Sequence, residues 1–191
     1  RDPLWSRGLG DVYKRQHLFG ASGSGTTTLG AALGERLGIP HLEADDYYWL
    51  PTDPPFTDKY PKAERWRRIR ERLQGHDDWV LSGGSVYNWG PGLIAEFTLA
   101  VFLRLPPDER MARLRRREAE RYGAQLDSDA AIQEKSRKFL AWAASYDTAT
   151  EGTRTPAQHR QWISSLHCPV LTLDSRASVA DLADQVLATI R

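Results

Sequence analysis

Between the first short apolar run of the chain and its first helical pattern lies the stretch Gly20-Ala21-Ser22-Gly23-Ser24-Gly25-Thr26-Thr27. Its glycines let the main chain curl so that several N–H groups converge, and the N-terminus of the following helix adds partial positive charge. The spacing matches the pattern GxxxxGK[ST], in which the last hydroxyl ligates Mg²⁺. The stretch therefore predicts a phosphate-binding loop, and the alternative is a tight turn that binds nothing.

One position departs from that pattern, because Thr26 stands where the pattern has lysine. A cation about 4 Å from a phosphate oxygen is worth roughly 4 kcal/mol at an effective dielectric constant of about 20. Used wholly in a transition state, that energy corresponds to about a thousandfold in rate. Three explanations stay open: another cation takes over, turnover is slow, or the domain binds nucleotide without turning it over. Lys59, Lys62 and an arginine-rich helix can each supply the missing charge.

Short apolar runs alternate with helical patterns along the chain. Strand patterns occupy 17–19, 40–42, 79–82, 98–105 and 170–173, and helical patterns cover 27–37, 61–75, 108–122, 129–146, 156–166 and 178–190. Strands separated by helices of this length pair in parallel through right-handed crossovers. We therefore expect an α/β three-layer sandwich, with surface loops at 50–61 and 148–156.

The start of the chain has a sequence unlike the rest. The chain begins with Arg1, its only methionine is Met111, and residues 11–16 (Asp-Val-Tyr-Lys-Arg-Gln) resemble the translation of a transposon end used to prepare sequencing libraries. We therefore expect residues 1–16 to be an assembly artefact and residues 17–191 to form a single domain. A natural N-terminal arm is the alternative.

The composition excludes several classes of protein. A chain of 191 residues with 40% hydrophobic residues can bury a core, and its single cysteine, Cys168, excludes an intramolecular disulfide. We therefore expect a reducing, cytoplasmic location. A formal charge of +1 gives no general attraction to nucleic acid, and no run of about 18 apolar residues is present. We expect neither a nucleic-acid nor a membrane partner, and the sequence leaves the oligomeric state open.

These features together resemble the adenylate-kinase-like branch of P-loop proteins, which includes nucleoside monophosphate, shikimate and gluconate kinases. The resemblance extends from about His17 to Ile190 and rests on the loop, an acidic pair, a glycine pair and the arginine-rich helix. It implies a five-stranded parallel sheet in the order 2-3-1-4-5, with ATP and Mg²⁺ as cofactors at the C-terminal ends of the strands. It also implies a helical lid at about 118–155 and phosphoryl transfer to a small anionic acceptor.

The acidic pair, Asp45 and Asp46, follows the second strand pattern. In shikimate-kinase-like enzymes a carboxylate at this place contacts the acceptor hydroxyl or the Mg²⁺ shell. The resemblance therefore implies a catalytic role for one of the two, and Asp45 is also a metal candidate. Adjacent aspartates that only cap a turn are the alternative.

The glycine pair, Gly83 and Gly84, is similar to the turn with which shikimate-kinase-like proteins approach an anionic acceptor. Bare backbone N–H groups bind carboxylate or phosphate in such a turn. Arg65 lies in the segment that binds the acceptor in this family, so the resemblance implies an acceptor contact there. A simple turn, and neutralisation of Arg65 by neighbouring glutamates, are the alternatives.

Four arginines, Arg110, Arg113, Arg117 and Arg121, fall on one face of the predicted helix after the fourth strand. Like charges at this spacing repel one another, and a bound polyphosphate would offset the repulsion. Arg113-Leu114-x-x-Arg117 matches the R-L-x-x-R stretch whose arginines meet the nucleotide in the family, and Arg121 lies near the lid arginines. The resemblance implies catalytic roles for Arg113, Arg117 and Arg121, and a solvated helix with glutamate partners is the alternative.

The predicted function is therefore an ATP-dependent kinase for a small molecule. Two other functions stay open: a regulatory module that binds nucleotide without turnover, and a slow nucleotide hydrolase. Thr27 is expected to ligate Mg²⁺. The residues expected to bind the nucleotide are Gly20, Ser22, Gly23, Ser24, Gly25, Thr26, Thr27 and Thr28.

Overall fold

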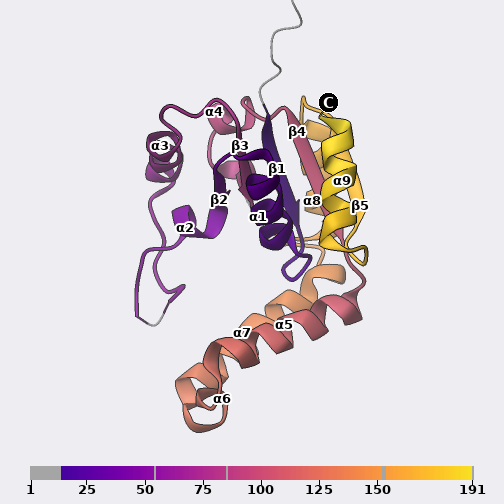
Figure 1. Cartoon of the computed structure of the whole chain (residues 1–191). Coiled ribbons are helices and arrows are strands. Elements are labelled where there is room, and N and C mark those ends of the chain that lie inside the picture. The colour runs from indigo at the N-terminus through magenta and orange to yellow at the C-terminus, as the bar shows by residue number, and fades with distance from the viewer. Residues whose placement is uncertain (1–13, 54, 85, 152–153, 191) are drawn as a thin grey trace, which may run out of the picture.

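The computed structural model describes residues 14–53, 55–84, 86–151 and 154–190, so residues 1–13 of the predicted artefact lie outside the described residues. Five strands pair in parallel in one sheet, in the order β2-β3-β1-β4-β5 (Figure 1). The predicted strand order is therefore confirmed. The strands are β1 (Arg15–Gly20), β2 (His41–Glu43), β3 (Trp79–Ser82), β4 (Leu99–Arg104) and β5 (Val170–Asp174).

Helices cover both faces of this sheet, as a three-layer sandwich requires. Helices α1 (Thr26–Leu37) and α9 (Val179–Thr189) lie on one face, in front of the sheet in Figure 1. Helices α3 (Lys62–Arg72), α4 (Pro91–Ile94) and α8 (Pro156–Ser165) pack on the other face. Because successive strand residues point to opposite faces, Leu18 joins the core under α1 while Phe19 packs with Trp162 of α8.

Local chemistry sets the ends of the longer helices. Gly38 ends α1 in the left-handed conformation, with φ +67°. The Asp129 side chain accepts hydrogen bonds from two backbone N–H groups at the start of α7 (Ala130–Ala144), and Thr155 caps α8 in the same way. The sequence analysis misses three short helices: α2 (Ala44–Tyr48), α4 and α6 (Gln125–Ser128).

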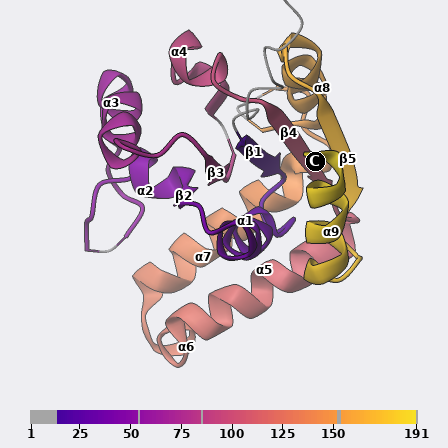
Figure 2. The same cartoon turned by 45° about the horizontal axis from the view of Figure 1, so that its top comes forward.

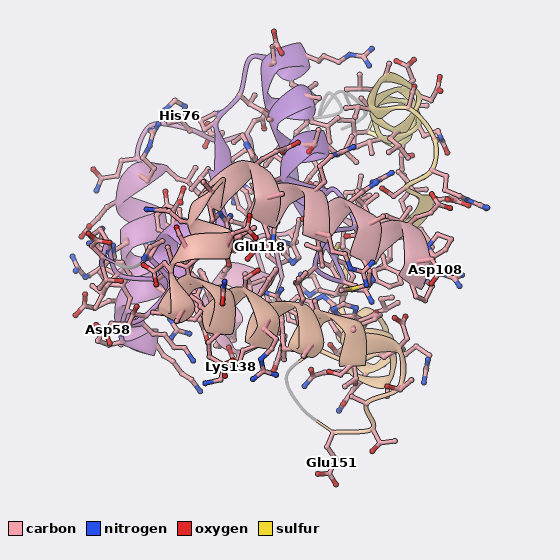
Figure 3. The ribbon with its side chains drawn as sticks, turned by 90° about the horizontal axis from the view of Figure 1, so that it is seen from below. Asp58, His76, Asp108, Glu118, Lys138 and Glu151 are labelled. Atoms are coloured by element: carbon pink, nitrogen blue, oxygen red, sulfur yellow. The ribbon has the colours of Figure 1, made fainter. Side chains whose placement is uncertain are left out.

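A helical hairpin projects from the C-terminal edge of the sheet. Its arms are α5 (Pro107–Tyr122) and α7, with α6 at the tip, and they lie side by side in Figures 2 and 3. Met111, Leu114 and Ala143 form a small apolar cluster between the arms. The hairpin includes most of the segment predicted to be a lid. None of the helices in the described ranges has the length and apolar character needed to cross a bilayer.

Strand β1 begins at Arg15, two residues before the predicted strand. Arg15 forms a 2.9 Å ion pair with Glu96, so this residue of the predicted artefact has a structural partner. Gln16 is fully buried, and neither end of its amide has a hydrogen-bond partner among the residues that the structure describes. The foreign origin of residues 1–16 stays a prediction.

Candidate functional site

The predicted phosphate loop joins the end of β1 to the start of α1. Gly23 and Gly25 have φ of +86° and +92°, a backbone conformation that glycine adopts without strain. A Cβ atom on Gly23 would lie 2.9 Å from Cγ of Leu114 and 3.0 Å from the carbonyl oxygen of Arg110. The turn and its close contact with α5 therefore both depend on glycine.

The N-terminus of α1 faces solvent without a side-chain cap. Its N-cap residue is Gly25, which has no side chain, and the first backbone N–H groups of a helix have no partner within the helix. Thr26 is half-buried, while Thr27 and Thr28 are exposed at this end. These N–H groups and the helix dipole together favour an anion at this end of α1, and phosphate binding there stays a prediction.

Thr27 and Glu43 bring two oxygen ligands together beside the loop. The Thr27 hydroxyl donates a 3.3 Å hydrogen bond to Oε2 of Glu43, the last residue of β2. Burial, with a further contribution from the Asp46 carboxylate, raises the pKa of Glu43. Hydroxyl and carboxylate oxygens suit Mg²⁺. Among the described residues, no three His, Cys, Asp or Glu side chains are grouped so that they could hold a metal ion, so a metal here would take its other ligands from phosphate and water.

Glu43 is missing from the predicted site residues. Its signal was its position, because the C-terminal ends of parallel strands meet at one edge of a sheet, and β2 ends at that edge. A carboxylate in the last position of a strand beside the phosphate loop is a metal candidate on that ground alone.

Asp45 and Asp46 are both exposed in the first turn of α2, and their neighbours differ. Asp45 interacts electrostatically with Arg117 and Arg154. Asp46 interacts with His41, and burial together with the Asp45 carboxylate raises the pKa of Asp46. The structure thus separates the predicted pair: Asp45 faces the basic side of the site, and Asp46 faces the histidine at the start of β2.

Arg110, the first of the four aligned arginines, is a structural residue with 1% of its surface exposed. Its guanidinium donates to the carbonyl oxygens of Ser22 at 3.2 Å and Ala143 at 2.9 Å, and to the Asp147 carboxylate at 2.7 Å. Ser22 belongs to the phosphate loop, whereas Ala143 is near the end of α7 and Asp147 lies just beyond that helix. Arg110 therefore fixes the base of the hairpin against the loop.

Arg113 lies beside the other end of the phosphate loop. It donates to the backbone oxygen of Ser175 at 2.9 Å and to the Ser175 hydroxyl at 3.3 Å. That hydroxyl in turn donates to the backbone oxygen of Ser24. The three residues therefore join α5, the turn after β5 and the phosphate loop.

Arg117 and Arg121 have different surroundings. Arg117 interacts electrostatically with the carboxylates of Glu43 and Asp45, so it faces the centre of the site. Arg121, one turn further along α5, forms a 3.1 Å ion pair with the buried Glu118. The structure brings Arg117 to the acidic residues and leaves Arg121 at the lid.

Arg154 reaches the site from a segment predicted to be a surface loop. Its Nη1 donates a 3.0 Å hydrogen bond to the hydroxyl of Ser22. A Cβ atom on Gly84 would lie 2.7 Å from Cζ of Arg154, so the guanidinium packs directly on the predicted glycine turn, in which Gly83 has φ +109°. The sequence offered one signal: the cap Thr155 begins the helix that leads back to β5, and such a helix begins at the C-terminal edge of a parallel sheet.

Arg65 is enclosed at the predicted acceptor side. It is 5% exposed, donates to the backbone oxygen of Tyr60 at 2.9 Å and stacks on the ring of Tyr48 at 4.2 Å. One turn later, Arg68 lies over the Tyr60 ring, and its buried Nε has no hydrogen-bond partner within the described part of the chain. Arg65 thus supports the wall of the site, and Arg68 keeps an unused donor.

Known proteins resemble this chain in sequence and in structure. Residues 17–136 match the family described as AAA domain (AAA_18). The uncharacterized protein YqaC of Bacillus subtilis (strain 168) is 44% identical over 174 residues, which cover 91% of this chain and 96% of YqaC. Shikimate kinase 2 of Sodalis glossinidius (strain morsitans) is 35% identical over 91 residues, 47% of this chain and 52% of that protein.

Solved structures share the architecture. Shikimate kinase from Acinetobacter baumannii, in complex with shikimate, superposes with a TM-score of 0.52 and 18% identity over 94% of each chain. Shikimate kinase from Bacteroides thetaiotaomicron gives a TM-score of 0.51 at 18% identity, over 93% of this chain and 98% of that one. The chain therefore belongs to the AAA domain family, with YqaC as a relative along nearly its whole length, and its fold is that of the P-loop kinases.

Proposed function

We propose that this protein is a kinase that transfers the γ-phosphoryl group of ATP to a hydroxyl group of a small anionic acceptor. The observation that carries the proposal is the contact between the Thr27 hydroxyl and the Glu43 carboxylate beside the uncapped N-terminus of α1. That arrangement puts donors for phosphate and oxygen ligands for Mg²⁺ at one point. Family and fold support the same reaction class.

The residues divide the work of phosphoryl transfer. The backbone N–H groups of the loop bind the β- and γ-phosphates, and Thr27 and Glu43 would hold Mg²⁺, which neutralises phosphate charge when bound. Asp45 accepts the proton of the acceptor hydroxyl while that oxygen bonds to the γ-phosphorus. The bond from the γ-phosphorus to the bridging oxygen breaks, and ADP leaves. Arg117, beside Asp45, stabilises charge on the transferring group.

The acceptor is expected to carry a negative charge. Arg68, one turn after Arg65 on α3, has a buried Nε donor with no hydrogen-bond partner among the described residues, and a carboxylate or phosphate satisfies such a donor best. The backbone of Gly83 and Gly84 and the enclosed Arg65 complete that wall. One solved structure with the same fold is a shikimate kinase in complex with shikimate, a ligand consistent with a small anionic acceptor.

The test is transfer of labelled γ-phosphate from ATP to a panel of hydroxy acids, sugar acids and nucleoside monophosphates. Glu43→Gln is expected to lower kcat roughly 100-fold and to raise the Mg²⁺ concentration needed for half-maximal rate, because a neutral amide is a poor ligand for the ion. Glu120→Gln is the matched control, since Glu120 lies exposed on α5 and pairs with the exposed Arg116. Equal rates for the two variants would contradict the role of Glu43.

Thr26 favours a second candidate, a module that binds nucleotide without transferring phosphate or that hydrolyses it slowly. Binding of ATP and Mg²⁺ without transfer to any acceptor would support the module. Phosphate release that is independent of acceptor would support the hydrolase. A cytoplasmic location suits all three functions, because each depends on cellular nucleotide.

A further inference from the structure

The phosphate loop lacks a charge that its pattern normally carries. The hydroxyl of Thr26 donates a hydrogen bond but brings no positive charge to a triphosphate. Preorganised cations supply much of the stabilisation when a phosphoryl group is transferred. If the site turns over ATP, a cation from elsewhere in the fold must lie beside the loop.

Three of the four aligned arginines of α5 are held by other groups, while Arg117 faces the carboxylates of Glu43 and Asp45. Arg110 is neutralised by the Asp147 carboxylate, and its remaining hydrogen bonds go to backbone carbonyl oxygens. Arg113 donates to Ser175, and Arg121 pairs with a buried glutamate. None of these three has a recorded hydrogen bond to a side chain of the phosphate loop, within the residues that the structure describes.

The lysines suggested by the sequence also lie elsewhere. The ammonium group of Lys59 lies over the rings of Tyr48 and Trp49, 5.4 Å and 5.3 Å from the ring centroids. Lys62 is exposed at the start of α3. Both belong to the segment that joins α2 to β3.

Arg154 is placed differently. Its Nη1 is 3.0 Å from the hydroxyl of Ser22, a side chain of the phosphate loop. A Cβ atom on Gly84 would lie 2.7 Å, 2.8 Å and 2.9 Å from Cζ, Nε and Nη2, so the guanidinium packs directly against the bare backbone of this glycine. Arg154 also interacts electrostatically with Asp45 and lies over the ring of Trp142. The group is therefore fixed between the phosphate loop and the glycine turn.

We propose that Arg154 replaces the missing lysine: its guanidinium binds the terminal phosphate of a nucleoside triphosphate held in the phosphate loop. This inference rests on the proposed function for the presence of a triphosphate. An arginine stays charged even when buried, and its planar fork matches two phosphate oxygens. Unlike a lysine within the loop, this cation arrives from the lid side, through the segment that joins α7 to α8.

The proposal is tested by restoring the lysine. Arg154→Gln is expected to weaken binding of ATP with Mg²⁺ about 100-fold in calorimetry while changing ADP binding less than about threefold, because ADP lacks the terminal phosphate. Thr26→Lys is then introduced both into the parent chain and into the Arg154→Gln variant. The gain in ATP affinity is expected to be at least about tenfold larger in the Arg154→Gln variant than in the parent chain. The effects of the two substitutions on ATP affinity would then be non-additive, because either cation can serve the same phosphate.

Two further variants and a stability measurement serve as controls for this experiment. Arg160→Gln removes an exposed arginine from the same region and is expected to leave ATP and ADP binding unchanged. Arg154→Lys keeps the charge and is expected to retain part of the preference for ATP over ADP. Thermal unfolding of each variant separates a lost contact from a lost fold.

Three outcomes would overturn the proposal. Arg154→Gln could weaken ATP and ADP equally, Thr26→Lys could fail to rescue it, or the variant could raise only the KM for the acceptor. If the protein binds ATP but transfers phosphate to no acceptor, only the kinase proposal fails. The role of Arg154 can still be tested in that case, because it is measured by the preference for ATP over ADP. If the parent chain binds no triphosphate, both proposals fail.

Discussion

The phosphate loop and the segment that carries Arg154 meet at one edge of the sheet, but they are built in opposite ways. The loop is a continuous run whose binding groups are backbone amides, shaped by glycines with positive φ. The cation is a single side chain, 132 residues further along the chain from its partner Ser22. The first can be recognised from eight consecutive residues, and the second exists only after the whole chain has folded.

This difference determines how each region can fail. A backbone site tolerates changes of side chain but not of conformation, whereas a side-chain cation is lost with one substitution. Arg110 connects the two regions, because its buried guanidinium joins the Ser22 carbonyl to Ala143 and Asp147 at the base of the lid. The loop and the lid base are therefore positioned relative to each other by a residue that has no predicted contact with substrate.

The largest expected effect comes from breaking the backbone region. Gly23→Ala places a Cβ atom 2.9 Å from Leu114 at a φ of +86°, so the loop must move. We expect ATP and ADP binding to fall together by at least about 100-fold, because misplacing two charge-assisted hydrogen bonds to phosphate costs roughly 3 kcal/mol. Calorimetry with both nucleotides measures this, and the equal losses contrast with the selective loss expected for Arg154→Gln.

Gly38→Ala is the matched control for that experiment. Gly38 also has a positive φ, but a Cβ atom there would meet nothing within 4 Å. We expect about 1 kcal/mol lower free energy of unfolding and unchanged nucleotide binding. Nucleotide affinity that survives Gly23→Ala, or drops in both variants, would remove the basis for assigning phosphate binding to this backbone.

Elements with a repeating apolar pattern could be predicted from the sequence. β3 coincides with the predicted strand 79–82, and α5 begins one residue before its predicted start at 108. Helices α2, α4 and α6 span four or five residues each, too few for a 3.6-residue period to repeat. Local patterns predict the long elements and the family resemblance supplies the strand order, while short helices depend on tertiary contacts.

The same limit applies to the site. The loop glycines and Arg117 could be proposed from the sequence, because contiguous motifs contain them. Glu43 and Arg154 become candidates only once the sheet order is known, because each depends on which strand ends and helix starts lie beside the loop. For Arg110 the sequence pattern is misleading in the other direction. Its spacing groups it with the arginines expected to bind phosphate, whereas its hydrogen bonds show a structural role.

Acid should loosen the side of the sheet that carries Arg154. Burial lowers the pKa of His17 in β1 to about 3. It also lowers the pKa of His159 in α8 to about 4. Below pH 6.5 the unfolded chain binds protons that the folded chain excludes, so stability is complete above that pH and lost as pH falls. Each histidine then contributes about 1.4 kcal/mol of lost unfolding free energy per pH unit.

Denaturant unfolding at pH 7 and pH 5.5 measures that loss, which we expect to be about 2.5 kcal/mol for the two histidines together. His17→Phe should remove about half of the difference, because the ring still stacks with Phe19 and Phe97 but no longer titrates. His76→Gln is the control, since His76 is exposed. An unchanged pH dependence in His17→Phe would show that the acid sensitivity lies elsewhere.

The smallest expected effect comes from a substitution in β1, the strand that precedes the phosphate loop, which should change the free energy of unfolding but not the ATP affinity. Gln16 is fully buried in β1, with both amide atoms lacking a hydrogen-bond partner among the described residues. Burying such a group without a partner costs about 1–3 kcal/mol. Gln16→Leu should therefore raise the free energy of unfolding by roughly 1–2 kcal/mol, and ATP affinity should stay the same because the loop begins four residues later. Gln133→Leu, an exposed change on α7, should give no such gain, and equal stabilisation by both would point to general hydrophobicity instead of a relieved buried amide.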